Sequence, residues 1–217
     1  IGTSGPGEIE KLAWIASPTV GVVTTVSLAH TAGLGSLEAV ADEKHKLLSS
    51  LSRDGVAIDC EDSTQLRARR AKIQASCALS FGESKGADVQ LVRYRLTESL
   101  TTECVLRVAG LEHEITAALG LCGHGPALDA AAALAVILAL HGAQAVAKAA
   151  AALADITPVA GRLSPVSGPR GSLIIDDGYN ANPASMAASL ETLTQLAAVR
   201  GGRAIAVLGD MGELGEH

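Results

Sequence analysis

The stretch SLIIDDGYNANPASM, which runs from Ser172 to Met186, constrains the fold of this chain more than any other stretch. An apolar run stops abruptly at two adjacent carboxylates, Asp176 and Asp177. Asn182 and Pro183 then form a helix start, because asparagine suits the N-cap and proline suits the first helical position. The stretch therefore predicts a strand, a polar turn and a helix, whose carboxylates either cap the turn or contact a ligand at the carboxyl end of the strand.

Patterns earlier in the chain place this unit in an α/β protein. The run VGVVTTV (20–26) is short, β-branched and uniformly apolar, as in parallel strands that are covered on both faces. Residues 36–51 carry apolar side chains at helical spacing, with Ser36 suited to the N-cap, and DGVAID (54–59) predicts a turn and a strand. From 75 to 118 the apolar runs are shorter, alternate and are broken by glycines. This change predicts a small mixed or antiparallel patch at the edge of the sheet.

The second half of the chain predicts two alanine-rich helices and a βαβ unit. The helices cover about 126–140 and 143–154, and the following segment, 155–172, is rich in Pro, Gly and Ser, as domain boundaries are. The βαβ unit consists of a strand, a helix and a strand at 172–177, 182–199 and 203–210. We expect its crossover to be right-handed.

Composition argues against several classes of protein. A net charge of -6 in 217 residues disfavours a binder of nucleic acid, which needs a basic face. The four cysteines form no CxxC pair, which favours a reduced cytoplasmic protein over a zinc site or a disulfide framework. The longest apolar stretch, 127–140, contains Asp129 and is shorter than the ~20 residues that span a bilayer, so we expect a buried helix there.

The ends of the sequence lead to a further expectation. The chain opens at Ile1 rather than Met, without the charged region or cleavage site of a signal peptide, and it stops soon after the predicted strand that ends at Asp210. We expect it to be an internal piece of a longer protein.

The carboxyl ends of the predicted strands are the first candidates for chemistry. Asp176, Asp177 and Asp210 all follow such strands, and ligands of open parallel sheets bind at these ends. Carboxylates there can accept from ribose hydroxyls or hold a magnesium ion, and the free amides of the helix that begins at Pro183 suit a phosphate. The alternative is that the aspartates merely cap the turn.

Four more charged residues are candidates, each with a structural alternative. Arg162, at the predicted domain junction, could bridge a phosphate between two lobes or be a solvated linker residue. His30 and Lys44 could converge near the end of the first strand, although a lone histidine is usually structural and Lys44 lies on an ordinary charged helical face. Glu8 is most simply a first-turn glutamate that complements the helix dipole.

Seven segments occur in the order and spacing of the bacterial Mur ligases. They are GTSGPGEIEKL, VVTTVSLAH, GLGSLEAVADEKHKLL, LSFGESKGADV, GRLSPV, IIDDGYNANPASMAASLETL and AVLGDMGELG. The chain resembles this family over its whole length, most closely the members that join D-alanyl-D-alanine to UDP-N-acetylmuramoyl-tripeptide. The patterns DD-YNANP-SM and LGDM-ELG are the more specific ones, while related ATP-dependent amide ligases share the others more loosely.

The resemblance implies an α/β fold in two domains. Residues 1–157 would be a central domain of P-loop type with a mostly parallel sheet, and residues 158–217 would begin a Rossmann-like C-terminal domain. No GxxxxGK[ST] run occurs, so the central domain would lack its P-loop and the 217 residues alone would be inactive. The implied protein is a cytoplasmic, monomeric ligase of peptidoglycan-precursor synthesis, without membrane insertion.

The resemblance also implies a reaction and its residues. ATP would convert the peptide carboxylate to an acyl phosphate, which the amine of D-alanyl-D-alanine attacks, while Mg²⁺ screens the charge. His30 would bind Mg²⁺, and Lys44 would match a lysine that is carbamylated in several members and so becomes a metal-binding carboxylate. The implied catalytic residues are Lys44, His30 and Arg162, and the implied ATP contacts are Asp129, Arg162, Asp176, Asp177, Tyr179 and Asn180.

Several positions depart from the family pattern, mostly on the ATP side. The departures are Thr25 for an asparagine, Gly125 for a histidine, Pro126 and Asp129 for two asparagines, Gly178 for a serine and Lys46 for an acid. Asp129 matters most, because a carboxylate cannot donate to a purine nitrogen as an amide does. Two alternatives therefore stay open: a catalytically degenerate homologue that acts as a binding module, and an amide ligase with another amine substrate.

Overall fold

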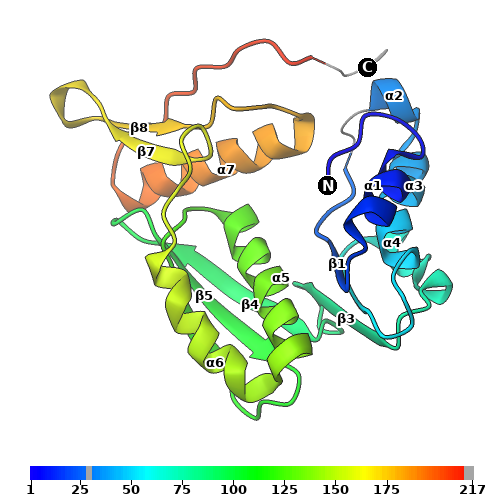
Figure 1. The fold of residues 1–217 in the computed structure, drawn as a ribbon. Helices are drawn as coiled ribbons and strands as arrows, with labels where there is room; N and C mark the ends of the chain where they lie inside the picture. Colours follow the sequence, from blue (N-terminus) through cyan, green and yellow to red (C-terminus); the bar gives the residue numbers. More distant parts are fainter. Residues whose placement is uncertain (28–30, 213–217) are drawn as a thin grey trace.

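The computed structural model describes residues 1–27 and 31–212. Within them, a six-stranded sheet with its helices forms a larger unit, and a two-stranded sheet with one helix forms a smaller one (Figure 1). The strands of the larger sheet are, in order across it, β1 (Val20–Val23), β2 (Val56–Cys60), β3 (Cys77–Gly82), β4 (Val89–Leu96), β5 (Thr102–Val108) and β6 (Ile115–Leu119).

The first four strands are parallel, which the apolar run 20–26 predicts for β1, whereas β3 and β4 lie in the segment predicted to be mixed or antiparallel. β1 pairs with β2 from Val20 opposite Val56, and β2 pairs with β3 from Val56 opposite Cys77. The helices of this half are α1 (Glu8–Ala16), α2 (Thr31–Leu34), α3 (Leu37–Ser49), α4 (Thr64–Arg67) and the 3-10 turn η1 (Arg70–Lys72). Ser36 caps α3 by accepting from the Ala39 amide at 3.2 Å, which confirms the predicted helix start.

The far side of the sheet is antiparallel. β3 and β4 share only two parallel pairs, Phe81 with Val89 and Gly82 with Gln90, whereas β4–β5 and β5–β6 are antiparallel hairpins. The prediction of an antiparallel patch at the sheet edge is confirmed. The physical reason is the length of the connections, 97–101 and 109–114, which can close hairpins but are too short for crossover helices.

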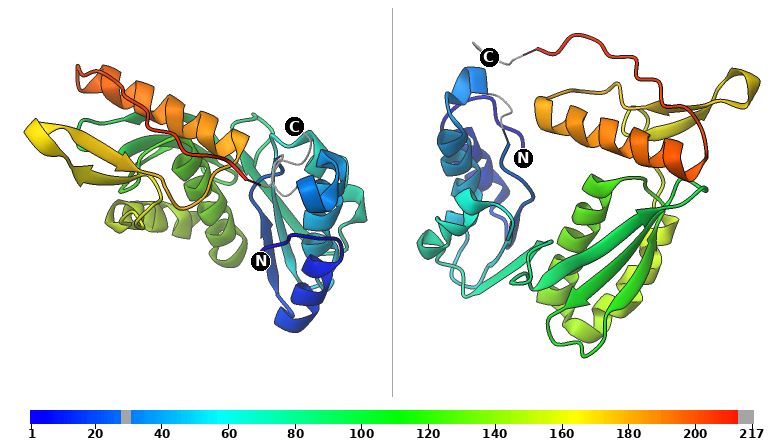
Figure 2. Two further views of the ribbon diagram at one scale, coloured as in Figure 1. Left: turned by 90° about the horizontal axis from the view of Figure 1, so that it is seen from above. Right: turned by 180° about the vertical axis from the view of Figure 1, so that it is seen from behind.

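Two helices, α5 (His124–His141) and α6 (Ala143–Ala152), lie on one face of β4–β6, and the 3-10 turn η2 (Leu153–Asp155) follows them (Figure 2). α5 begins two residues before the predicted helix and packs across β2, β3 and β4 through small side chains. Within the described residues it is also the one helix long and apolar enough to cross a membrane, with one third of that window buried. A helix in the core of a domain can be equally long and apolar, and α5 contacts the sheet as such a helix does.

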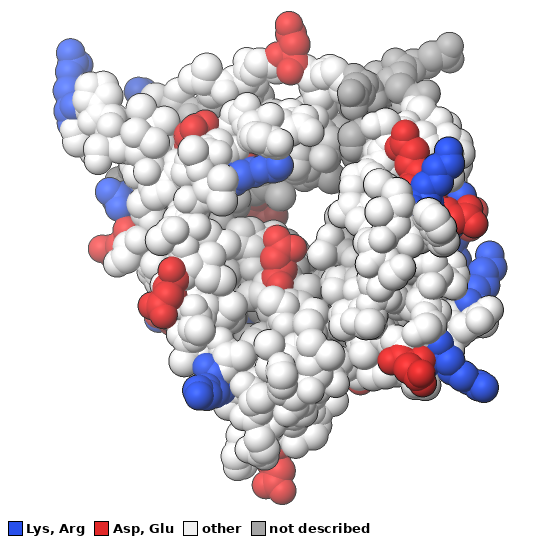
Figure 3. All heavy atoms as spheres, in the orientation of Figure 1, with Lys and Arg blue, Asp and Glu red and all other residues white. Residues whose placement is uncertain are grey.

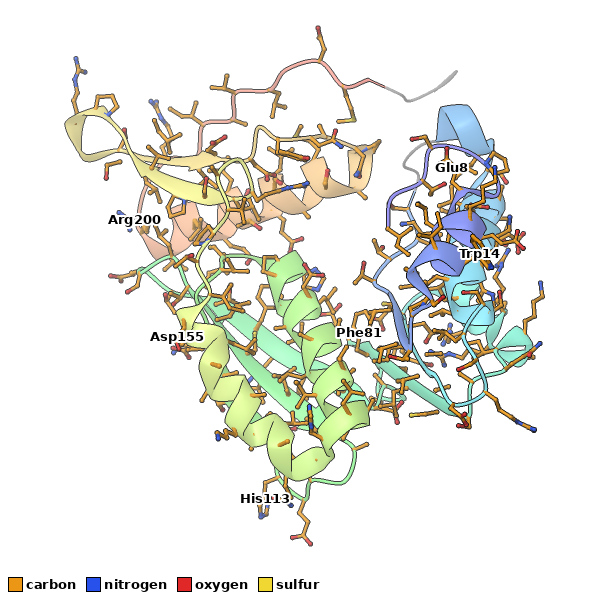
Figure 4. All side chains as sticks on the ribbon, viewed as in Figure 1. Glu8, Trp14, Phe81, His113, Asp155 and Arg200 are labelled. Atoms are coloured by element: carbon orange, nitrogen blue, oxygen red, sulfur yellow. The ribbon has the colours of Figure 1, made fainter. Side chains whose placement is uncertain are left out.

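The main core lies between this sheet and its helices. Its largest fully buried side chains include Phe81, Leu48, Ile58 and Leu134, and Figure 4 places Phe81 at the sheet beside α5. Buried alanines of α5, among them Ala127 and Ala131, let the helix approach the strands closely.

The smaller unit differs from the predicted βαβ arrangement. Its elements are β7 (Ser164–Ser167), the turn η3 (Pro169–Gly171), β8 (Leu173–Asp176) and α7 (Pro183–Val199). β8 and α7 are where the sequence predicts them, but the partner of β8 is the antiparallel β7, which the sequence did not indicate.

The predicted third element, a strand at 203–210, is wrong for this structure. The segment forms no strand, and Val207 is 93% exposed. Alternation and apolarity favour a strand, but a strand also needs a neighbouring backbone with free hydrogen-bonding groups in register. No ladder pairing joins 203–210 to the described strands, so the βαβ unit and its crossover hand are not formed here.

Candidate functional site

A hollow opens between β1 and α3 on one side and α5 and α7 on the other (Figure 3, in the orientation of Figure 1). Several of the residues singled out by sequence lie on the elements around it. The predicted domain boundary, between 157 and 158, falls in the connection from η2 to β7 and stays a prediction.

Arg162 and Tyr179 meet although 17 positions separate them. The guanidinium carbon of Arg162 lies 4.1 Å from the centre of the Tyr179 ring. The Tyr179 amide donates to the Gly161 carbonyl at 3.2 Å, and Gly161 has a φ of 75°. A side chain at Gly161 would be strained by that φ and would crowd Tyr179, so glycine permits the close approach of the two segments.

Asp177 ties the same two segments together from the other side. Its carboxylate accepts from the Leu163 amide at 3.1 Å and from the Ser189 hydroxyl on α7. Asp176 accepts from the Gly178 amide at 3.1 Å, in an Asx turn, and its side chain is exposed. Asp176 therefore has the turn-capping role that the sequence left open and keeps further acceptor capacity toward solvent, whereas Asp177 joins the 161–163 segment to α7.

The start of α7 satisfies part of its own amides. Asn182 Oδ1 accepts from the Ser185 amide at 2.9 Å, and Ser185 Oγ accepts from the Asn182 amide at 3.0 Å, which is a capping box. Asn180 Oδ1 accepts from the Ala181 amide at 2.8 Å. The expectation that the first amides of this helix are all free for a ligand is therefore corrected, since the cap takes the Ser185 amide.

A pocket of about 1100 Å³ lies between β8, α7 and the segment 205–212. Its lining includes Asp176, Asp177, Asn180 and Asp210, which are predicted from sequence to lie at strand ends or in the following turn. The structure thus brings these polar groups together, although Asp210 does not end a strand.

Lys44 lies on α3, on the other side of the hollow. Its Nζ donates to the Thr25 carbonyl, just beyond β1, at 2.8 Å. Burial lowers the pKa of Lys44, which favours the neutral amine that a carbamylation requires. His30, predicted to act beside it, lies outside the described residues.

Asp129 projects from α5 and is exposed to solvent, although the protein atoms around it crowd its carboxylate. The surrounding protein raises the pKa of Asp129 by desolvating the carboxylate. Near it, Pro126 fits the first turn of the helix, where an amide has no intrahelical partner, and a side chain at Gly125 would meet no other atom within 4 Å. Positions 125 and 126 are thus sterically tolerant, whereas a Cβ added at Gly178 would lie 3.2 Å from Asp176 Oδ1.

Glu43 is a residue that sequence reasoning missed. It is 2% exposed and accepts from the amides of Gly7 and Ile9, both at 2.9 Å, and from Lys46 Nζ at 2.9 Å. Burial raises the pKa of Glu43, but these hydrogen bonds outweigh it, so the net pKa is lowered. The pair Glu43 and Lys46, three positions apart in EKHKL, was the available signal, since such residues share a helix face.

Glu8 lies in the first turn of α1, as expected, and has a second role. Its carboxylate turns back to accept from the Ser4 and Gly5 amides at 2.6 and 3.1 Å, and hydrogen bonds from these amides lower the pKa of Glu8. The glycine-rich segment before α1 is therefore held by one carboxylate on each side, Glu8 and Glu43. This segment contains no lysine that could bind a phosphate, as the sequence indicates.

Metal ligands are sparse in the part of the chain that the structure describes. It contains no group of three or more His, Cys, Asp or Glu side chains that could hold an ion. Lys44 as an amine is a hydrogen-bond donor and not a ligand for Mg²⁺. These residues do not by themselves fit a magnesium site.

Comparisons with known proteins fit this arrangement of a sheet unit, a smaller unit and a junction between them. Residues 1–137 match the Mur ligase middle domain, and residues 161–217 match the Mur ligase glutamate ligase domain. The chain therefore belongs to the Mur ligase family.

Its relatives include UDP-N-acetylmuramoyl-tripeptide–D-alanyl-D-alanine ligases. That of Mycobacterium tuberculosis (strain ATCC 25618 / H37Rv) is 35% identical over 215 residues, which are 97% of this chain and 41% of the relative. That of Escherichia coli (strain K12) is 29% identical over 216 residues, 99% of this chain and 46% of the relative. The chain thus spans less than half the length of these relatives.

Solved structures of the same ligase superpose on the whole chain. The crystal structure of MurF from Acinetobacter baumannii matches with a TM-score of 0.86 and 27% identity, over 100% of this chain and 45% of that one. MurF from Thermotoga maritima, solved in complex with ADP, matches with a TM-score of 0.78 and 27% identity, over 98% and 47%. The mixed α/β fold with a mostly parallel six-stranded sheet is confirmed.

Proposed function

We propose that the protein containing this chain is an ATP-dependent ligase that joins D-alanyl-D-alanine to UDP-N-acetylmuramoyl-tripeptide in peptidoglycan-precursor synthesis. The observation that supports it best is the meeting of Arg162, Tyr179 and Asp177 at the junction of the two units, next to the start of α5. The names of the relatives support the choice of substrates, and the ADP complex of a similar structure supports the nucleotide.

The roles of individual residues are part of this proposal. Arg162 supplies a delocalised cation for phosphate oxygens, and its stacking on Tyr179 limits the positions that the guanidinium can take. Asp176 and Asn180 offer exposed oxygens and an amide to the nucleoside from the turn before α7. Asp129 approaches from α5, and Lys44 approaches from α3 across the hollow.

The reaction divides into two balanced steps. A carboxylate oxygen of the peptide attacks the γ-phosphorus of ATP and ADP leaves, which gives an acyl phosphate. The amine of D-alanyl-D-alanine then attacks the acyl carbon, phosphate leaves and the amine loses a proton, which forms the amide. Arg162 would stabilise the negative charge that develops on the transferred phosphoryl group.

Mg²⁺ belongs to the proposal only as an expectation from the family. Its ligands would be a carbamylated Lys44 and His30, and the lowering of the Lys44 pKa by burial supports the carbamylation. Mass spectrometry of the intact protein in bicarbonate would detect one added carboxyl group on Lys44. Because the described residues form no metal cluster, we derive no step through the ion.

One observation favours a degenerate homologue instead. Both oxygens of Asp177 are engaged inside the protein, and the departures at Thr25, Gly125, Asp129 and Gly178 remove polar groups or change their chemistry. Such a protein would bind the nucleotide or the UDP-sugar without turnover. A ligase that accepts another amine is the third possibility.

Assays of the full-length protein distinguish these three proposals. Phosphate release from ATP should depend on both UDP-N-acetylmuramoyl-tripeptide and D-alanyl-D-alanine, and Arg162→Ala should reduce it at least tenfold. Arg170→Ala, an exposed arginine of the β7–β8 hairpin, is the matched control. No turnover with intact protein contradicts the proposal, and turnover with other amines only assigns a different substrate. The 217 residues alone should not hydrolyse ATP.

Cellular location and oligomeric state also remain proposals. We infer a cytoplasmic monomer, because ATP and the UDP-sugar are cytoplasmic metabolites of the proposed reaction and the candidate residues described by the structure all come from one chain. Light scattering of the full-length protein measures the oligomeric state.

A further inference from the structure

Tyr94 makes two contacts with elements that border the proposed ATP site. The residue lies on β4, and its ring stacks on His124, the first residue of α5, with centroids 5.2 Å apart and an interplanar angle of 27°. Its hydroxyl accepts from Gln195 Nε2 on α7 at 3.0 Å. Tyr94 therefore connects the start of α5 with α7, on which Gln195 lies 101 positions after Tyr94.

Contacts from the larger sheet hold the start of α5 in place. The Gly123 amide, directly before His124, donates to Thr102 Oγ1 on β5 at 3.1 Å, while His124 Nε2 lies 3.3 Å from a carboxylate oxygen of Glu83, just after β3, without forming a hydrogen bond. Thr102 is fully buried and donates in turn to the Leu121 carbonyl at 2.8 Å. Tyr94 thus stacks on a residue that the sheet already holds in place.

α7 is held on the larger unit through its C-terminal half. A Cβ added at Gly123 would lie 2.9 Å from Thr192 Oγ1, and Leu196 is buried with Leu96 and Cys122. At the end of the helix, Arg200 Nη1 donates to the Glu98 carbonyl in the β4–β5 turn at 2.9 Å (Figure 4). Gln195 stands in the middle of these contacts.

The N-terminal half of α7 projects toward the hollow and carries the site. The helix begins directly after the turn with Tyr179 and Asn180, about 18 Å from Gln195 at a rise of 1.5 Å per residue. A rotation of about 5° at Gln195 would move that turn by roughly 1.5 Å, and a misplacement of about 1 Å can cost a hundredfold in rate. Contacts of the C-terminal half of α7 therefore control the position of the turn at its N-terminal end.

We propose that Tyr94 is a positioning residue, which through Gln195 and His124 sets the placement of the Tyr179–Asn180 turn relative to the start of α5. The inference rests on the proposed ATP site for its effect on nucleotide binding, but the geometric effect does not require it. Tyr94 touches no proposed substrate atom, so it acts through the placement of α7.

The test uses the full-length protein and separates the hydroxyl from the ring. Tyr94→Phe removes the acceptor of Gln195 and keeps the stacking on His124, and Gln195→Leu removes the donor. Gln144→Leu, on the exposed face of α6, is the matched control for the second change. Spin labels on Glu10→Cys and Ala187→Cys, both at exposed positions of α1 and α7, report the distance between the two units without nucleotide.

We expect Tyr94→Phe and Gln195→Leu each to broaden the distance distribution and to raise the KM for ATP roughly two- to tenfold, as the loss of one neutral hydrogen bond allows. Gln195→Leu also removes a hydrogen bond of 3.0 Å to the exposed Glu191, so the double variant should match Gln195→Leu, because Tyr94→Phe then has no bond left to remove. Gln144→Leu should match the unmodified protein. Unchanged distances in both single variants, or additive effects in the double variant, overturn the inference. If the unmodified protein binds no ATP, the proposed function fails while the distance measurement still decides the role of Tyr94.

Discussion

The Arg162 guanidinium lies 4.1 Å above the ring of Tyr179, so the junction between the two units carries an oriented cation. An exposed cation–π contact contributes about 0.5–1 kcal/mol, and Tyr179→Leu should therefore weaken ATP binding roughly two- to fivefold. Tyr179→Phe keeps the ring and should bind ATP nearly as well as the unmodified protein. Isothermal titration on the full-length protein measures both. Equal losses in the two variants would assign the effect to the hydroxyl, and no loss in Tyr179→Leu would remove the role of the stacking.

Asp129 should make nucleotide binding depend on pH. Its pKa is raised by partial desolvation, so the protonated acid, which can donate as an amide does, persists to higher pH than in an aspartate free in water. ATP affinity should fall as pH rises through this raised pKa. Asp129→Asn should bind ATP roughly two- to tenfold tighter at neutral pH, the value of one neutral hydrogen bond, and lose the pH dependence. Titrations over a pH series, with the exposed Asp155→Asn as control, would show a flat profile in both proteins if the idea is wrong.

Folding stability provides an independent check on Asp129. The folded state binds the proton more tightly than the unfolded chain, whose aspartate titrates near 3.8. The stabilising contribution is full below that pH and is lost as pH rises through the raised pKa. Asp129→Asn should therefore increase the free energy of unfolding at neutral pH and leave it nearly unchanged in acid, as urea unfolding would record.

Glu43 should be essential for the stability of the first unit. Glu43→Ala leaves two backbone amides and Lys46 without their acceptor, which should cost about 2–4 kcal/mol. Lys46→Ala keeps the two amide bonds and, at a partly exposed position, should cost under about 1 kcal/mol. Because the pKa of Glu43 is lowered, its contribution is present above about pH 4.5 and is lost as pH falls through the folded pKa. Equal destabilisation by the two variants would refute this division of roles.

Leu196 should report how firmly α7 is held on the larger unit. It is 2% exposed among Leu96 and Cys122, and Leu196→Ala should lower the free energy of unfolding by about 2–4 kcal/mol. Leu190, on the same helix but 36% exposed, gives the control variant Leu190→Ala, which should cost under about 1 kcal/mol. Calorimetry of the full-length protein measures both, and a similar small cost at the two positions would mean that α7 is not anchored at Leu196.

Local patterns predicted most elements of the fold correctly. Ser36 as N-cap, the parallel β1 and the mixed, partly antiparallel edge all follow from spacing, caps and turn residues that act over a few positions. The segment 203–210 shows where such reasoning stops. Its apolar pattern fits a strand, yet strand formation depends on a paired neighbour, and the sequence carries no local sign that β8 would pair with β7 instead.

For the site, the sequence by itself determined which chemistry is present: Arg162, Tyr179, the aspartate pair, Lys44 and the unusual Asp129, in motifs of the Mur ligase family. Only the tertiary structure decided how these groups are used. It engaged Asp177 in the packing, stacked Arg162 on Tyr179, and linked Tyr94 to Gln195 across 101 positions. The physical reason is range: propensities and caps act within a helical turn, whereas hydrogen-bond partners, burial and pKa shifts depend on segments that meet only in the folded chain.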